Sequence, residues 1–442
     1  MLNRFTSDYL ESLGIPDFTP SPKISGRLAS FDGLLMEAVG LTLPVGTVCQ
    51  VGTRGAGVEA EVIGFRNGRT LLMNLGGPAP LVPQMPVRPL GPPGEAEVGA
   101  ALLGRVVDGA GRPIDGLGPI RGADRWPLSG KLQSPLDRGR VLQPLDVGVR
   151  AINGLLTVGQ GQRIGIMAGS GVGKSVLLGM IVRAAQADVI VIGLIGERSR
   201  EVADFLETKV AGEARQRAVV VAVPANHSPV LRIRGALRTH AIAEAFRAQG
   251  KKVLLIMDSL TRVAHAGREI GLALGEPASA RGYPPSAIAM LPNLIERAGT
   301  CVSSGGSITA IYTVLADGDD GNDPVVDSAR SILDGHIVLS RALAEHGVYP
   351  AIDIGPSVSR VMTDITGKAH QMAARVLRRH LATYEENRDL VLMGAYRAGA
   401  DPAIDAAIAC HPAVMEYIRQ DPDEVVPLAD AIAELTGVFG DG

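Results

Sequence analysis

The stretch Ile164-Gly-Ile-Met-Ala-Gly-Ser-Gly-Val-Gly-Lys-Ser-Val-Leu-Leu178 changes character over a short distance. It begins inside an apolar run, Arg163–Met167, of the kind found in strands that are buried on both faces. A glycine-rich segment follows, and Val176–Gln186 then has a helical pattern. The sequence therefore predicts a strand, a tight loop and a helix, in that order.

The loop in this unit matches a phosphate-binding pattern at all but one position. Ala168-Gly-Ser-Gly-Val-Gly-Lys-Ser175 fits G-x-x-x-x-G-K-[ST], except that Ala168 replaces the first glycine. An alanine is tolerable there if its φ is negative and its methyl group points away from the phosphates. Successive backbone N–H groups and the helix N-terminus would then surround a phosphate. We expect a nucleotide at this loop, bound by Gly169, Ser170, Gly171, Val172, Gly173, Lys174, Ser175 and Val176.

Two further elements extend this candidate site. In the loop, Lys174 should reach the β- and γ-phosphates and the Ser175 hydroxyl should ligate Mg²⁺. The apolar strand Val253-Leu-Leu-Ile-Met-Asp258 ends in a carboxylate, and Asp258 is expected to hold the water shell of that ion. Glu197 follows the buried run Val189–Ile195, so it should emerge at the carboxyl edge of the sheet, where ligands bind. On these grounds alone Glu197 fits two roles, a base that polarises the attacking water or a solvated glutamate paired with a neighbouring arginine.

Composition sets limits on the class of protein. A chain of 442 residues suggests two to four domains, and 46% hydrophobic with 20% charged residues is ordinary for a globular protein. A net charge of -3 lacks the basic footprint of a nucleic-acid binder, which weakens a helicase interpretation. The three cysteines follow no metal spacing, and neither a signal peptide nor a membrane-spanning run is evident. We expect reduced thiols and a cytoplasmic protein without bound nucleic acid.

The N-terminal part should contain a helix and a small barrel. Leu2–Leu13 can form an amphipathic helix in residues 1–23, which either docks on a partner or membrane surface or packs on its own domain. In residues 24–94 short β-type runs alternate with glycine-rich turns, and Asn67-Gly68 is a strong hairpin signal. This pattern predicts an antiparallel barrel that ends in a Pro/Gly linker, Val87–Gly94. The predicted strands are Leu34–Val39, Thr47–Val51, Glu59–Phe65 and Arg69–Asn74.

The rest of the chain should be α/β and then helical. Continuous apolar runs in residues 95–368 predict a mostly parallel sheet covered by helices. Besides those already named, the runs are Ala218–Val223, Ser307–Leu315 and His336–Leu339, and Thr239–Gln249 has a helical pattern. Residues 369–442 should form a helical domain with a long helix over His370–Met393. Asp401-Pro402 and Asp421-Pro422 each have the pattern of an N-cap followed by proline at the first helical position.

With these elements in place, the chain resembles the catalytic subunits of rotary F/V-type ATPases and, within that superfamily, the ATPases of type III protein export. The resemblance runs from about residue 26 to residue 368. Its motifs are Gly104–Gly116, Gly148–Gly154, Gly196-Glu-Arg198, Met257–Arg262, Gly282–Ser286, Asp334–Arg341, Val348–Asp353 and Ser357–Arg360. An alanine at the position of Ala168 is common in this family, so the resemblance implies that the loop binds ATP.

The resemblance also implies roles for single residues. Glu197 matches the carboxylate that activates water, and Arg198 and Arg262 match contacts to the γ-phosphate. Tyr349 matches the aromatic residue on which adenine packs, although an ordinary strand-end tyrosine fits the same position. Arg360 matches an arginine finger given to the nucleotide of the next subunit, and the alternative for it is a structural arginine at a subunit contact.

One chain carries Lys174, Glu197 and Arg360 together, which favours a homohexamer with a complete site at every interface. The loop Thr313–Arg330 is closer to the flagellar than to the injectisome pattern of export ATPases. The resemblance implies these partners: a regulatory dimer on the N-terminal helix, a central stalk protein, a membrane export gate, and export chaperones with their substrates. It also implies a location at the inner face of the cytoplasmic membrane.

Three other functions are weighed against this one. A rotary synthase subunit would be inactive alone, and a catalytically dead scaffold conflicts with the intact Lys174, Glu197 and Arg360. An RNA-translocating hexamer of the transcription-termination type would need closely spaced aromatic and basic residues in its barrel, which this barrel lacks.

Overall fold

The structure of the chain is a computed structural model that describes residues 25–53, 57–77, 80–91, 94–315 and 323–440. The expected helix over Leu2–Leu13 lies outside these residues. Contacts between Cα atoms divide the chain into two compact units, Met1–Pro93 and Gly94–Gly442. Each unit is described by itself below.

The first unit is a closed antiparallel barrel with the strand order β1-β2-β5-β4-β3-β6. Its strands are β1 (Gly26–Phe31), β2 (Leu35–Val39), β3 (Val48–Val51), β4 (Val58–Arg66), β5 (Arg69–Asn74) and β6 (Pro86–Pro89). Asn67 and Gly68 have φ angles of 50° and 73°, as the tight turn between β4 and β5 requires, so the predicted hairpin is confirmed.

One part of the barrel differs from expectation. Strand β6 lies at the start of the stretch predicted as a Pro/Gly linker. It closes the barrel because Val87 is fully buried and pairs with Gly26 of β1 and Val51 of β3. Its two flanking prolines, Pro86 and Pro89, hid the strand from a pattern analysis, since proline is rare in strands away from edges and ends.

The second unit is built on a large sheet with the order β17-β16-β10-β15-β13-β11-β12-β8. These strands are β8 (Val106–Val107), β10 (Arg163–Ala168), β11 (Val189–Ile195), β12 (Ala218–Val223), β13 (Lys252–Asp258), β15 (Ser307–Leu315), β16 (Gly335–Leu339) and β17 (Ile352–Ser359). All neighbours from β16 to β8 are parallel, and β17 is antiparallel to β16. The mostly parallel sheet that the apolar runs predicted is therefore confirmed.

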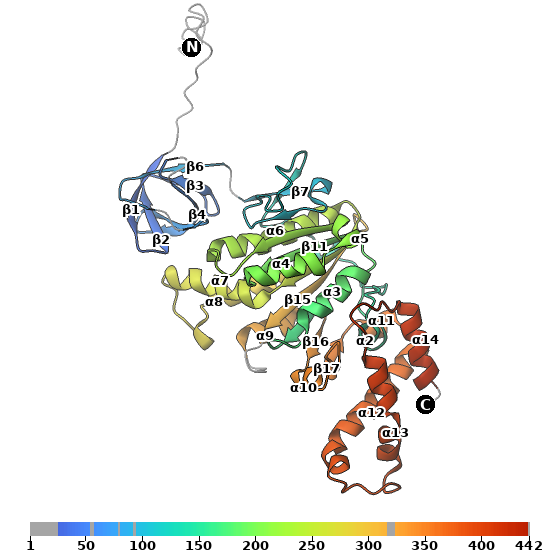
Figure 1. Ribbon diagram of the computed structural model, residues 1–442. Helices are drawn as coiled ribbons and strands as arrows, with labels where there is room; N and C mark the ends of the chain where they lie inside the picture. The colour runs from blue at the N-terminus through green and yellow to red at the C-terminus, as the bar shows by residue number, and fades with distance from the viewer. Residues whose placement is uncertain (1–24, 54–56, 78–79, 92–93, 316–322, 441–442) are drawn as a thin grey trace, which may run out of the picture. The chain divides into compact units, whose positions relative to one another are not determined.

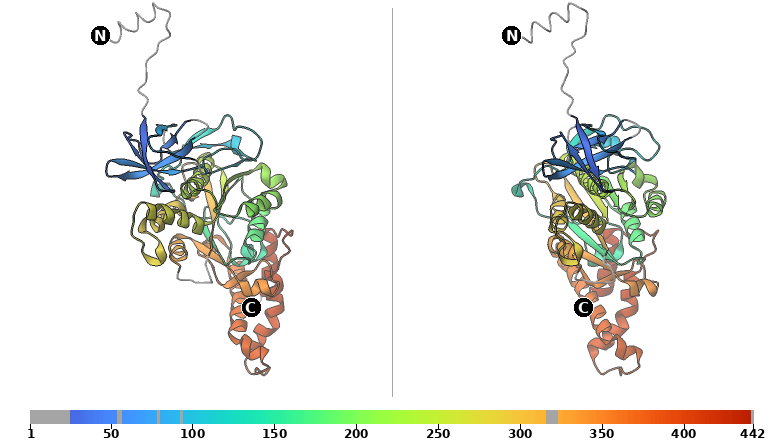
Figure 2. Two further views of the ribbon diagram at one scale, coloured as in Figure 1. Left: turned by 60° about the vertical axis from the view of Figure 1, so that its left-hand side comes forward. Right: turned by 90° about the vertical axis from the view of Figure 1, so that its left-hand side faces the viewer.

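Helices cover both faces of this sheet (Figures 1 and 2). Every residue of β11 and β12 is buried, which explains why these strands are apolar throughout and do not alternate. The helices are α2 (Arg150–Leu155), α3 (Lys174–Ala184), α4 (Ser199–Thr208), α5 (Gly212–Gln216), α6 (Pro229–Ala248), α7 (Leu260–Ala273), α8 (Pro285–Ile295), α9 (Pro324–Ile332), α10 (Arg341–Glu345) and α11 (Met362–Ile365). Short strands β7 (Glu95–Val98) and β9 (Asp124–Pro127) pair with each other, and β14 (Gly299–Thr300) pairs antiparallel with β15.

The C-terminal part is helical, with α12 (Lys368–Leu392), α13 (Pro402–Ile418) and α14 (Leu428–Phe439). Its side chains belong to the same hydrophobic cluster as the sheet, since Leu377 and Leu435 pack in one core with Ile166 of β10. No helix within the described ranges has both the length and the apolar character that a membrane crossing demands.

The two predicted N-caps of this part have different outcomes. Asp401 caps α13 by accepting a hydrogen bond from the N–H of Ala403, as predicted. The prediction that Asp421-Pro422 starts a helix is wrong, because α14 begins only at Leu428. Asp421 instead accepts the N–H of Asp423 in a local turn, and the chain beyond it is drawn to the sheet unit by a hydrogen bond from Val426 N–H to the carbonyl of Gly148.

Candidate active site

The phosphate-binding loop connects the end of β10 to the start of α3. Ala168 is the last residue of β10, lies in extended backbone and is 2% exposed, so its methyl group is packed into the core. The condition for an alanine at this position is therefore met. Gly171 and Gly173 have φ angles of 80° and 91°, which a residue with a side chain adopts only with strain.

A cavity of about 600 Å³ opens at this loop. Its lining includes the loop residues Gly169, Ser170, Gly171, Gly173, Lys174, Ser175 and Val176, together with Glu197, Arg198, Glu201, Arg262 and Leu315. Among the expected nucleotide contacts, Val172 is buried at 2% exposure and does not line the cavity. The cavity thus brings together the two arginines, the glutamate and nearly all of the loop that the sequence singled out.

Lys174 lies between two carboxylates at the bottom of this cavity. Its Nζ donates to Asp258 Oδ1 at 2.5 Å and lies 3.4 Å from Glu197 Oε1. Burial alone would lower the pKa of Lys174, but the charges of Asp258 and Glu197 outweigh burial, so the pKa is raised and the lysine stays charged. In this buried cluster one cation, Lys174, therefore faces two carboxylates.

Glu197 is held in an unusual environment for a carboxylate. Burial and the nearby charge of Asp258 raise its pKa, and Lys174 only partly offsets this. Its side chain is 12% exposed and contacts Lys174, so a solvated glutamate paired with an arginine does not describe it. Gly196 aims Glu197 into the cavity, because its φ is 75° and a Cβ there would lie 2.6 Å from Cβ of Arg262.

The two predicted phosphate-contacting arginines stand at the rim. Arg198 is 85% exposed at its side chain and lies 3.3 Å from Glu201, which the sequence analysis did not single out. Arg262 lies in the first turn of α7, where the Ser259 hydroxyl accepts its N–H, and its Nε is buried without a hydrogen-bond partner among the described residues. A buried guanidinium nitrogen without an acceptor fits a group that waits for an anionic ligand.

The residues present fit a magnesium ion held together with a nucleotide. Ser175 and Asp258 offer a hydroxyl and a carboxylate oxygen next to the phosphate loop. No cluster of three or more His, Cys, Asp or Glu side chains suited to a metal occurs in the parts of the chain that the structure describes. Magnesium commonly takes only one or two protein oxygens and fills its shell with phosphate oxygens and water.

Tyr349 lies beside the loop and not inside the cavity. A Cβ built on Gly173 would be 3.4 Å from both Cδ1 and Cε1 of its ring, so the ring packs against the loop. Tyr349 is 40% exposed and lines a neighbouring cavity together with Arg419 and Gln420 of the C-terminal part. The N–H of Gln420 donates to the carbonyl of Tyr349 at 2.9 Å. No pattern in the sequence predicted that C-terminal residues would lie here.

Arg360 lies at the opposite edge of the sheet from the loop. Its N–H donates to the carbonyl of Asp334, whose own N–H donates to the carbonyl of Arg163 at the start of β10. The loop begins at the other end of β10, roughly 16 Å away for a strand of this length. Arg360 is exposed, and within the described residues its side chain donates a hydrogen bond to the carbonyl of Arg330. Arg360 therefore does not enter the cavity of its own chain.

The fold and the cavity define a phosphate-loop ATPase with a RecA-like core. The model of the ATP synthase alpha/beta family, nucleotide-binding domain, matches residues 148–359, and that of the T3SS EscN ATPase C-terminal domain matches residues 366–437. The chain is 50% identical to the flagellum-specific ATP synthase of Pseudomonas aeruginosa over 98% of its length and 96% of that protein. It is 46% identical to the type 3 secretion system ATPase of Pseudomonas savastanoi pv. phaseolicola over 93% of its length and 92% of that protein.

A solved structure has the same architecture. The assembled ATPase EscN of the type III secretion system of enteropathogenic E. coli matches with a TM-score of 0.88 and 41% identity, over 94% of this chain and 100% of that one. EscN has also been solved in complex with its central stalk EscO, with a TM-score of 0.86. The chain belongs to the family of flagellum-specific ATP synthases and type 3 secretion system ATPases, and it is an ATPase of type III export.

Proposed function

We propose that ATP binds in the cavity at the phosphate loop and is hydrolysed there with Mg²⁺. The backbone N–H groups of Gly169 to Ser175 hold the phosphates, and Lys174 leaves Asp258 to contact the β- and γ-phosphates. Ser175 and Asp258 would hold the ion, which would lower the charge that builds up on the phosphate oxygens. Tyr349 supports the adenine from the side of Gly173.

Glu197 orients the water that attacks the γ-phosphate. The observation that carries this role is that Lys174, which lines the cavity together with Glu197, lies between Glu197 and the buried Asp258. When Lys174 turns to the phosphates, Glu197 loses its cation, and its raised pKa makes it a better proton acceptor than an ordinary carboxylate. Arg198 and Arg262 at the rim contact the γ-phosphate, which requires Arg198 to leave Glu201.

The site is completed by a second copy of the chain. Arg360 is exposed at the sheet edge opposite to its own loop, which supports a role in the cavity of a neighbouring subunit. A guanidinium there would stabilise the charge of the transition state and can be worth about 10³–10⁵ in rate. Repeating this contact around a closed ring gives a homohexamer in which every interface holds one site.

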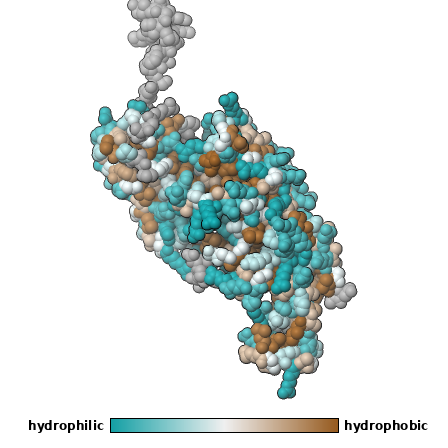
Figure 3. Space-filling model, viewed as in Figure 1, coloured by the Kyte–Doolittle hydropathy of each residue, from teal (hydrophilic) through white to brown (hydrophobic). Residues whose placement is uncertain are grey.

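The proposed work of the ring is to release flagellar export substrates from their chaperones and deliver them to a membrane export gate. Two flagellar relatives are 50% identical to the chain, against 46% for a type 3 secretion relative, which supports the flagellar branch, while two other flagellar relatives are 43% identical. A central stalk is proposed as a partner at the helical part, as EscO is for EscN. In support, Leu390, Leu392 and Met393 at the end of α12 are exposed, and Figure 3 shows apolar side chains gathered near this end.

Two further associations are proposed on the resemblance alone. A regulatory dimer would bind the N-terminal residues 1–23, and this would keep the ring near the inner face of the membrane. Deletion of these residues should abolish co-purification with such a dimer and leave ATP hydrolysis by the remaining chain in place.

The test of the shared site is the ATPase rate per chain as a function of protein concentration. If each site needs two copies, the rate per chain rises with concentration until rings are complete, in step with the mass measured by light scattering. A rate per chain that is the same in dilute monomer and in assembled rings would rule out a site shared between copies.

A further inference from the structure

The hydroxyl of Thr313 lies next to the predicted magnesium-site carboxylate. Strand β15 runs parallel to β13, and the register that pairs Met257 with Tyr312 brings Thr313 level with Asp258 at the carboxyl edge of the sheet. Both side chains are buried, with Thr313 at 0% and Asp258 at 3% exposure. No phosphate-loop pattern assigns a role to this threonine.

The hydroxyl donates to Asp258. Thr313 Oγ1 is 2.5 Å from Asp258 Oδ1 and 3.4 Å from the carbonyl oxygen of Met257. A threonine hydroxyl has one hydrogen to donate, and the shorter contact to a charged acceptor is the stronger one. The hydrogen therefore points to the carboxylate.

The same carboxylate oxygen also receives Lys174 at 2.5 Å. Within the described residues, Lys174 and Thr313 are the side chains that donate to Asp258. ATP binding, in the function proposed above, takes Lys174 away to the phosphates. Thr313 would then remain as the side chain that donates to Oδ1 and keeps the Asp258 carboxylate in place.

We propose that Thr313 is a positioning residue for the magnesium site, acting through Asp258. The inference rests on the proposed role of Asp258. Groups that orient a metal-binding side chain typically matter by tenfold to a hundredfold in metal affinity. Thr313 thus keeps the Asp258 carboxylate oriented when Lys174 leaves it on ATP binding.

The chain offers a matched control for this idea. Thr309 lies on the same strand, is 2% exposed, and its hydroxyl accepts the N–H of Gly161 at 2.8 Å, at the other end of β15 from the cavity. Thr313→Val and Thr309→Val make the same chemical change at equal burial. Thr313→Ser keeps the hydroxyl and should restore what valine removes.

The experiment measures equilibrium binding of Mn²⁺ in the presence of ADP by electron paramagnetic resonance, and binding of ADP alone in EDTA. We expect Thr313→Val to weaken Mn²⁺ binding about tenfold, with Thr313→Ser and Thr309→Val within about twofold of the parent chain. Metal-free ADP binding should be equal in all four proteins.

Two results would overturn the inference. One is Mn²⁺ binding by Thr313→Val that is no weaker than by Thr309→Val, and the other is loss of metal-free ADP binding in Thr313→Val, which would make the threonine merely structural. The variant Asp258→Asn distinguishes a failure of this inference about Thr313 from a failure of the proposed magnesium site. If Asp258→Asn leaves Mn²⁺ binding intact, the proposed magnesium site is wrong. If Asp258→Asn weakens binding and Thr313→Val does not, only the role of Thr313 fails.

Discussion

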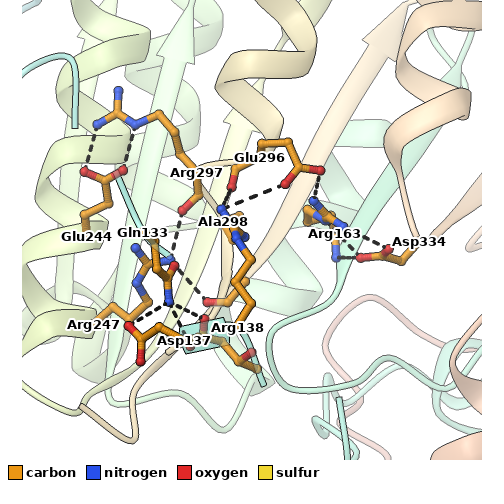
Figure 4. Close-up of polar contacts among 12 residues, drawn as sticks. Gln133, Asp137, Arg138, Arg163, Glu244, Arg247, Glu296, Arg297, Ala298 and Asp334 are labelled. Carbon is orange, nitrogen blue, oxygen red and sulfur yellow. Dashed lines mark hydrogen bonds and ion pairs between the residues drawn. The ribbon is translucent and has the colours of Figure 1, made fainter. Parts of the chain in front are cut away.

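The two edges of the large sheet both carry buried charge, but they pair it differently. At the amino edge Glu244, Asp334 and Glu296 each lie against at least one arginine (Figure 4), and Arg163 is shared between Asp334 and Glu296. Glu244 accepts from Arg297 at 2.8 and 3.0 Å, and Asp334 accepts from Arg163 at 3.1 Å. At the carboxyl edge Glu197 and Asp258 share the single Lys174.

This difference distinguishes charged residues that stabilise the fold from charged residues that bind a ligand or take part in a reaction. A buried acid that is fully paired holds elements together, since the Glu244–Arg297 pair joins α6 to the segment after α8. An underpaired cluster has a carboxylate whose pKa is raised and leaves room for a further cation. Arg360 lies at the amino edge and is exposed, as its proposed role in the cavity of another copy requires.

The largest effect is expected at the underpaired edge. Glu197→Gln keeps the shape of the side chain but removes the carboxylate, so kcat should fall by about 10³ while ATP binding remains. Steady-state ATPase rates and nucleotide titration measure the two properties. Glu201→Gln is the control, because it makes the same chemical change at a second glutamate of the cavity, one that pairs with the rim residue Arg198 and lies next to Glu197. Equal losses in the two variants would contradict the assignment of Glu197.

A substitution at the amino edge, where the carboxylates are paired with arginines, should lower the free energy of unfolding. Arg297→Ala leaves Glu244, which is 2% exposed at its side chain, without its cation, although the indole N–H of Trp126 still donates to it. Removing one partner of such a pair costs about 3–5 kcal/mol of unfolding free energy. Urea unfolding measures the loss, and kcat at low temperature should change little. A large drop in kcat with unchanged stability would contradict the account, because the amino edge would then serve catalysis and not stability.

A smaller effect is expected for the ring beside the loop. Tyr349→Ala should raise KM for ATP about tenfold, since aromatic stacking on a base is worth about 1–3 kcal/mol, and kcat should stay near its parent value. Tyr349→Phe keeps the ring and should behave as the parent chain. If phenylalanine raises KM as much as alanine does, the tyrosine hydroxyl and not the ring is what ATP needs.

The smallest expected effect is a shift of the acid limb of the pH–rate profile to higher pH. Because the pKa of Glu197 is raised above the usual 4.5, this carboxylate takes up a proton at a higher pH than an exposed glutamate does. The acid limb of kcat/KM for the free enzyme should therefore fall above pH 4.5 as the pH is lowered. A pH profile over the range in which the fold is intact checks this. An acid limb at or below the ordinary glutamate value would show that Glu197 is not the limiting group.

The sheet and the loop were predictable because their signals are local. Buried parallel strands such as β11 are apolar at every residue, and the glycine spacing of the loop is demanded by its backbone. Strand β17 is different, because it is an edge strand with a glycine and a proline, Gly355 and Pro356, in its interior. Its strand character depends on pairing with β16, which local pattern does not reveal.

The missed parts of the site depend on contacts between distant segments. Thr313 meets Asp258 only because β15 lies next to β13, and Gln420 meets Tyr349 only because the C-terminal helices pack on the core. The wrong N-cap prediction at Asp421 has the same cause. The polar residues there form a turn, as their pattern allows, and the hydrogen bond of Val426 to the sheet unit delays the start of the helix. The local sequence pattern was enough to predict the loop residues, but the residues that contact them depend on the strand order and on helix packing.

The central claim is that the carboxyl edge of one copy and the amino edge of the next form one site. The most direct test is the ATPase rate of an equimolar mixture of Glu197→Gln and Arg360→Ala chains, each inactive alone. In randomly mixed rings about a quarter of the interfaces join an intact Glu197 to an intact Arg360, so activity should return to about that fraction of the parent rate. A mixture that stays as inactive as its components, although light scattering shows mixed rings, would contradict the shared site.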